Sequence, residues 1–177
     1  MKKSIFLNLM TVAMMAAMCV TFTACGGDDG DSTPGKPDGP SGQTGSTEYV
    51  TPCLDFGSSV AHVKEYMSGT IWELNENSND DVLLYMNNQA TTVVNYMFIN
   101  SKLHMTTVTY NGGGESKANA FKAEIEKLYG VTMARENDPD NPAQFVYHCT
   151  VTVNQKSVVI MMTCYAQGIN ILYSLPD

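Results

Sequence analysis

Residues 116–130 read SKANAFKAEIEKLYG and predict an amphipathic helix that lies between two series of short strands. Phe121 and Ile125 recur at helical spacing, so the helix has one apolar face that must pack against another element. Gly130 follows the last turn and is a typical helix end. The stretch therefore predicts a helix that covers one side of a sheet.

Strand-length runs follow this helix and are separated by turn-forming residues. The turns are rich in asparagine, aspartate, proline and glycine, which favour the backbone conformations of tight turns. Short connections of this kind are typical of antiparallel hairpins, because parallel strands need long crossovers. The predicted strands cover 131–135, 144–153, 157–165 and 169–175.

The same order of elements precedes this helix in the first half of the folded part. Gly57-Ser58-Ser59 predicts a hydroxyl-capped helix start, with Val63 and Met67 on its apolar face. An extended lead-in over 48–56 comes before it. Strand-like runs follow at 70–74, 82–86, 91–99 and 103–110.

The sequence thus predicts an α+β fold made of two tandem repeats, each with one helix followed by a roughly four-stranded antiparallel sheet. The first repeat spans 48–111 and the second spans 112–177. Chance similarity among hairpins is the alternative explanation of the repeat.

Several predicted strands are apolar on both faces, although a sheet covered by one layer of helices needs only one apolar face. The favoured interpretation packs the second face against the other repeat. The alternative is an exposed surface of aromatic and methionine side chains that binds a partner. The candidate binding residues are Trp72, which could instead anchor the core, Tyr96, Phe98 and Tyr165.

The N-terminal residues predict where the protein is located. Two lysines and an apolar run over 5–22 end in Phe22-Thr23-Ala24-Cys25, which resembles the lipobox of bacterial lipoproteins. We expect 1–24 to be a signal peptide and Cys25 to carry the lipid that anchors the chain to the outer membrane. A transmembrane anchor is the alternative, but glycine and aspartate follow instead of a positively charged stop-transfer sequence.

Residues 25–47 predict a disordered tether between the lipid and the folded part. Residues 26–47 contain no aliphatic or aromatic side chain that could offset the entropy of ordering. The glycine- and acid-rich start resembles the export signal of surface lipoproteins in some Gram-negative anaerobes, which implies display at the cell surface. The alternative is that these acids only keep the tether solvated.

Two resemblances concern the folded part. Gly57-Ser58-Ser59-x-x-x-Val63-x-x-x-Met67 resembles the opening of BamE/SmpA-type lipoproteins, in which a capped helix lies on a small antiparallel sheet. The doubled order of elements resembles the beta-lactamase-inhibitor-protein fold. Both families act through surface contacts, so the resemblance implies binding. The second copy and the long tether depart from the BamE type, and no functional residue can be transferred.

Composition and motifs argue against several classes of activity. Loss of residues 1–24 leaves 8 basic and 18 acidic residues, a net charge of −10, which does not suit nucleic-acid binding. No G-x-S-x-G motif or phosphate-binding loop occurs, and the acidic turns lack the pattern of a calcium loop. His62, His104 and His148 are scattered in the sequence. We therefore predict no catalytic residues, no cofactor and no metal.

Three cysteines remain in the folded part, at positions 53, 149 and 164. One disulfide with a spare thiol and three buried reduced thiols are both compatible with the sequence. A hairpin that turns at 154–156 predicts Cys149 opposite residue 161 or 162, which makes Cys164 a poor bridging partner.

These observations predict a lipid-anchored envelope protein that acts as a non-catalytic, inhibitor-like module for binding a protein or ligand. The alternative is a structural accessory lipoprotein of an outer-membrane complex that faces the periplasm. An enzyme ranks third.

Overall fold

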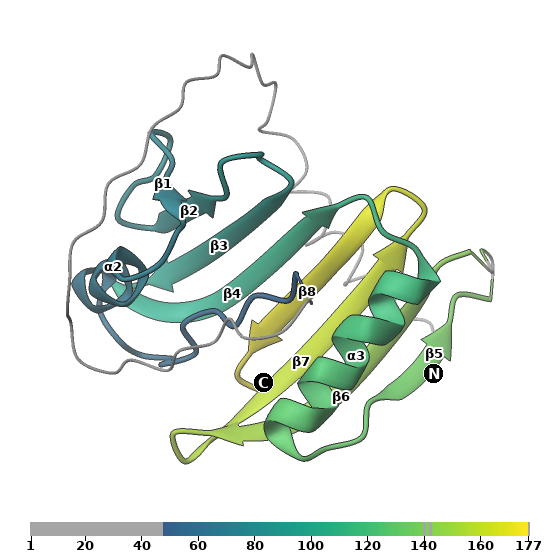
Figure 1. Cartoon of the computed structure of the whole chain (residues 1–177). Helices are drawn as coiled ribbons and strands as arrows, with labels where there is room; N and C mark the ends of the chain where they lie inside the picture. Colours follow the sequence, from purple (N-terminus) through teal and green to yellow (C-terminus); the bar gives the residue numbers. More distant parts are fainter. Residues whose placement is uncertain (1–47, 140, 142, 177) are drawn as a thin grey trace. The chain divides into compact units, whose positions relative to one another are not determined.

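Two helix-plus-strand repeats form a single eight-stranded antiparallel sheet in the computed structural model of the chain (Figure 1). The structure describes residues 48–139, 141 and 143–176. The strand order is β1-β2-β3-β4-β8-β7-β6-β5. This arrangement confirms the predicted α+β class. The predicted signal peptide at 1–24 and the tether at 25–47, with its lipidation site Cys25, lie outside the described residues.

The first repeat begins with α2 and contains the strands of one half of the sheet. Ser59 caps the helix, since its side chain accepts a hydrogen bond from the backbone N–H of His62. The elements are α2 at Val60–Ser68, β1 at Glu73–Leu74, β2 at Val82–Met86, β3 at Thr92–Ile99 and β4 at Lys102–Asn111.

The second repeat begins with α3, the helix predicted from residues 116–130. It ends at Gly130, whose φ of 65° is the left-handed conformation that glycine adopts without strain. The elements are α3 at Glu115–Tyr129, β5 at Ala134–Asn137, β6 at Phe145–Val153, β7 at Lys156–Tyr165 and β8 at Gly168–Ser174.

The two repeats meet edge to edge at a seam between β4 and β8. These strands pair from Met105↔Ser174 to Asn111↔Gly168. Close approach at the seam requires a glycine, because a Cβ at position 168 would overlap the backbone carbonyl oxygen of Tyr110. The interpretation that the second face of each sheet packs against the other repeat is therefore wrong, since the repeats extend one sheet sideways.

The two edge strands are shorter than predicted or shifted because the helix ends hold the preceding residues. Thr70, in the predicted strand 70–74, bonds back to the carbonyl oxygen of Met67, so pairing starts only at Glu73. In the second repeat the predicted strand 131–135 becomes β5 at 134–137. There, the backbone N–H of Met133 donates to the Glu126 carboxylate at 2.8 Å.

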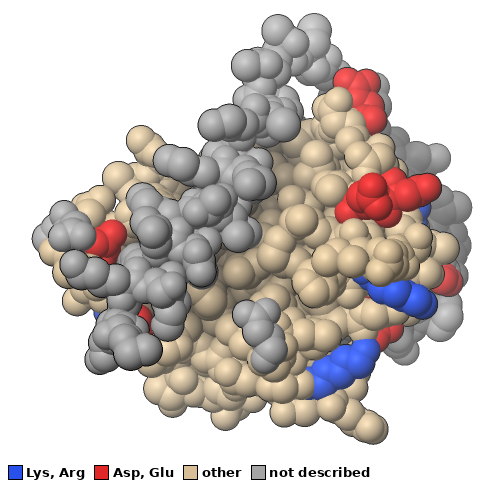
Figure 2. Space-filling view, turned by 180° about the vertical axis from the view of Figure 1, so that it is seen from behind, with Lys and Arg blue, Asp and Glu red and all other residues tan. Residues whose placement is uncertain are grey.

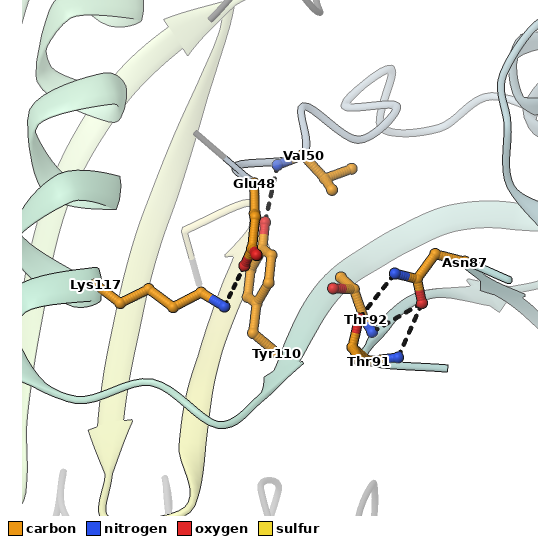
Figure 3. A network of polar contacts seen from close by, with 7 residues as sticks. All are labelled: Glu48, Val50, Asn87, Thr91, Thr92, Tyr110 and Lys117. Carbon is orange, nitrogen blue, oxygen red and sulfur yellow. Dashed lines mark hydrogen bonds and ion pairs between the residues drawn. The ribbon is translucent and has the colours of Figure 1, made fainter. Parts of the chain in front are cut away.

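The lead-in over 48–56 is a strap that crosses the helix side of the sheet between α2 and α3 (Figure 1). Tyrosine hydroxyls from the strands accept hydrogen bonds from its backbone. The N–H of Val50 donates to the Tyr110 hydroxyl at 2.8 Å, and the N–H of Cys53 donates to the Tyr96 hydroxyl at 3.0 Å. Figure 3 shows the first of these bonds beside the ion pair between Glu48 and Lys117. The strap closes the core where the helices leave a gap.

Turn chemistry fixes the register of the hairpins. Asn100 and Ser101 join β3 to β4, and Asn154 and Gln155 join β6 to β7, all with the positive φ that type I′ hairpin turns require at both central positions. Asn87 holds the β2–β3 turn by accepting from the backbone N–H groups of Thr91 and Thr92 (Figure 3).

The two-residue turn at 154–155 corrects the predicted position of Cys149. This cysteine lies opposite Ile160, not residue 161 or 162, and Cys164 pairs with Phe145. Cys53, Cys149 and Cys164 all carry free thiols.

Candidate functional site

The sheet has two different faces, and only one of them carries the helices and the strap. The inner face holds the core, including Tyr96, Tyr110 and Tyr173, which have no exposed surface. Both helices and the strap lie on this side (Figure 1). The alternate side chains of the same strands point to the opposite side, which we call the outer face.

The outer face is ordered in three rows that run across six strands. Directly paired residues share a face, so the strand register defines each row. The first row is Val82, Met97, Met105, Ser174, Val159 and Thr150; the second is Leu84, Asn95, Thr107, Leu172, Met161 and His148; the third is Met86, Val93, Thr109, Asn170, Thr163 and Val146.

None of these eighteen positions carries Asp, Glu, Lys or Arg, although such residues make up 16% of the whole chain. Figure 2 views the molecule from this side and, where described residues are visible, shows charged side chains toward the margins. An uncharged centre with a charged margin is the usual composition of a surface that binds protein.

Most outer-face side chains are partly accessible. Met97 is 37% exposed, and Ile99, which follows it on the same face at the end of β3, is 52% exposed. Thr107, Val146 and Thr163 are buried, Thr150 is exposed, and the remaining positions are half-buried. The accessible surface is therefore mainly aliphatic and thioether.

A polar strip lies along the seam at the centre of the outer face. The Asn170 side-chain amide donates to the Thr109 hydroxyl at 2.9 Å across the β4–β8 pair. Thr107 lies beside them, opposite Asn95 on β3. The carboxamide oxygen of Asn95 is buried and has no hydrogen-bond partner in the described part of the chain. Apolar side chains flank this strip on both halves of the sheet.

The structure separates the four predicted binding residues. Tyr96 and Phe98 lie on the inner face, 0% and 5% exposed, so their side chains are not available to a partner. Trp72 is half-buried and packs against the core. Tyr165 lies on the outer side at the end of β7. Burial raises the pKa of its phenol, and a hydrogen bond with Thr163 offsets only part of that increase. The four residues therefore do not form one site.

The residues that face outward are the alternate ones on the same strands, and sequence reasoning did not select them as candidates. Met97, Val159, Met161 and Leu172 face outward while the larger aromatic side chains face the strap. The signal that could have found them is the set of alternate strand positions that carries the tyrosines. A buried tyrosine hydroxyl needs a hydrogen-bond partner, and the strap's backbone supplies it, so the tyrosines face inward and the other positions face outward.

Ionisable side chains of the described residues form pairs with one another rather than groups that could hold a metal ion. Groups of three or more His, Cys, Asp or Glu that could hold a metal are absent from this part of the chain. The His62 ring, at an exposed position, lies 3.3 Å from the Asp55 carboxylate, and the half-buried His148 ring lies 3.4 Å from the Glu136 carboxylate.

Burial raises the pKa of the Cys149 thiol to about 11 and that of Cys164 to about 12. These thiols are therefore protonated at neutral pH, whereas a nucleophilic cysteine needs a depressed pKa.

Of the helices in the described residues, neither is both long enough and apolar enough to cross a membrane.

No protein-family model, no curated protein and no solved structure matches this chain. The resemblances to BamE/SmpA-type lipoproteins and to the beta-lactamase-inhibitor-protein fold therefore remain predictions.

Proposed function

We propose that the protein is a non-catalytic binding module whose outer face holds an apolar, uncharged patch of another protein. The observation that carries this proposal is the absence of charged side chains from all eighteen outer-face positions, in a chain with 28 charged residues. Desolvating a charge is costly, so a surface without charges loses little when a partner covers it.

The size of the outer face suits a protein partner. Six strands spaced about 4.8 Å apart and three rows about 7 Å apart cover on the order of 600 Å². A standard protein interface buries about 800 Å² on each partner. The outer face with its margin thus approaches the area that one side of a stable complex needs.

The chemistry of the outer face favours a protein over a nucleic acid. No Lys or Arg lies in the three rows to neutralise phosphates. Four methionines, at positions 86, 97, 105 and 161, offer flexible thioether surface that adapts to apolar side chains. The strip at Asn170 and Thr109 offers groups that fix the orientation of a partner.

The proposed place of action is the outer membrane, with the chain anchored by lipid on Cys25 and displayed at the cell surface. The lipobox-like stretch before Cys25 and the acid-rich residues after it support this placement. Protease treatment of intact cells should remove the folded part. If the folded part is protected in intact cells and is cleaved only after the outer membrane is opened, the alternative of an accessory lipoprotein that faces the periplasm would be favoured.

Site-specific photo-crosslinking tests the binding proposal. We expect a photoreactive residue at Leu84 or Val159, one in each half of the outer face, to capture the same partner in cells. The same residue at Lys127, exposed on α3, is the matched control and should capture nothing. Capture of a second copy of the chain, or equal capture from Lys127, would overturn the proposal.

Purified components then give the energetic test. Val159→Lys and Leu84→Lys should each weaken the complex at least tenfold, because a buried unpaired ammonium is costly. Lys127→Glu should leave the affinity unchanged. Thermal unfolding of each variant checks that the fold is intact, and unchanged affinity in both outer-face variants would contradict the proposal.

A further inference from the structure

A β-bulge at the start of β4 places three potential metal-binding side chains, two methionines and one histidine, together on the outer face. Met97 pairs with Met105, whereas the next residue, Phe98, pairs with Leu103. His104 is therefore the extra residue, and it shares with Met105 the position opposite Met97. Bulges of this kind redirect side chains at functional sites.

Burial shows which way the bulge residues point. Leu103 is 2% exposed and Thr106 has no exposed surface, so both side chains face inward. The two residues between them do not: His104 is exposed and Met105 is half-buried. A regular strand would turn one of these two inward, so the bulge is what leaves both on the outer side.

Met97 completes the group from the neighbouring strand. It is 37% exposed on the outer face, and directly paired residues have Cβ atoms about 5 Å apart. Thioether side chains are long and flexible enough to bring both sulfur atoms to one ion at that separation. The strands that carry them are held in register by the tight turn at Asn100 and Ser101.

We propose that Met97, His104 and Met105 bind a soft monovalent metal cation, Cu(I) or Ag(I). Thioethers are soft, neutral ligands that select such ions, and imidazole is a good ligand for copper. Hard cations such as Ca²⁺ and Mg²⁺ require oxygen ligands, which these three side chains lack. This proposal is independent of protein binding, because the metal needs only one end of the outer face.

Titration with Ag(I), which has no competing divalent state in water, tests the site. The sample is the full-length chain with Cys19→Ser, Cys25→Ser and Cys149→Ser, which remove thiols that would compete for the ion. With ¹³C-labelled methionine methyl groups, the first equivalent of Ag(I) should shift the signals of Met97 and Met105. The signals of Met86 and Met161, on other parts of the outer face, should stay in place.

Isosteric variants provide the matched controls. Met97→Leu and Met105→Leu remove the sulfur but keep the apolar volume, and each should weaken Ag(I) binding at least tenfold. Met161→Leu should leave binding unchanged, and Zn²⁺ in tenfold excess should not displace Ag(I).

Three outcomes would overturn the proposal: equal shifts at all methionines, no shift at Met97 and Met105, or unchanged affinity in both of their leucine variants.

Discussion

At the scale of single residues, the tyrosine hydroxyls are the main link between the sheet and the strap. Tyr110, Tyr96 and Tyr173 are buried on the inner face, and each hydroxyl has a partner in or beside the strap. An unpaired hydroxyl or N–H at these depths would destabilise the fold, so these bonds specify where the strap lies.

Tyr110→Phe tests this role. The substitution leaves the N–H of Val50 buried without an acceptor, so we expect the free energy of unfolding to fall by about 1–3 kcal/mol. Tyr66→Phe is the matched control: its hydroxyl bonds to the Thr51 carbonyl oxygen at 3.3 Å in an exposed setting, and its loss should cost under about 1 kcal/mol. Urea unfolding measures both values, and equal losses would show that the buried bond has no special weight.

The raised thiol pKa values predict how the cysteines react. Burial favours the neutral thiol, so the reactive thiolate of Cys149 should be scarce at pH 8 and increase about tenfold per pH unit until pH about 11. Alkylation followed by peptide mass spectrometry measures this rate. In urea the alkylation rate of Cys149 should stop increasing above pH about 8.5, the ordinary pKa of a cysteine thiol. A native profile that also levels off there would contradict the effect of burial.

Residue-level prediction from the sequence had a specific limit. The alternation in 92–99 was evident, but two apolar sets, one with Tyr96 and one with Met97, competed for the core. Hydrophobicity alone does not decide between them. The hydrogen bond from the Cys53 backbone to the Tyr96 hydroxyl decides it, and that contact joins residues 43 apart in the sequence.

At the scale of elements, the seam between β4 and β8 is the contact that makes one sheet from two repeats. Gly168→Ala should cost about 3 kcal/mol of unfolding free energy or more, because its Cβ would overlap the Tyr110 carbonyl oxygen and push the strands apart. Gly69→Ala is the control, since no atom lies within 4 Å of a Cβ there and its φ is −89°. That variant should change stability by under about 1 kcal/mol. Similar thermal shifts in both would rule out the steric explanation.

The elements themselves were largely predictable because local chemistry defines them. Ser59 and Gly130 mark helix ends through a cap and a left-handed residue, and both act as the sequence indicates. The edge strands were less predictable. Their starts depend on contacts with the preceding helix, such as the bond from Met133 to Glu126, that no strand pattern contains.

At the scale of the whole molecule, the sequence predicted the two repeats but not how they join. Apolar side chains on both faces of 92–99 and 156–165 are expected of buried strands, which favoured packing of one repeat on the other. The pairing of β4 with β8 instead leaves the outer face as a broad uncharged surface. Strand pairing between distant segments depends on backbone geometry at positions such as Gly168, which hydrophobic patterning does not report.

The seam also determines the order in which the molecule assembles in time. Its paired residues lie 57 to 69 positions apart in the chain, whereas the hairpins β3–β4 and β7–β8 close around two-residue turns. Closing a long loop costs more entropy than closing a short one, so the hairpins should form early and the seam last. During synthesis one edge of β4 therefore stays unpaired until β8 has left the ribosome. For that interval its unpaired backbone groups are available to any other extended chain, so the speed of translation through the second repeat becomes a determinant of yield.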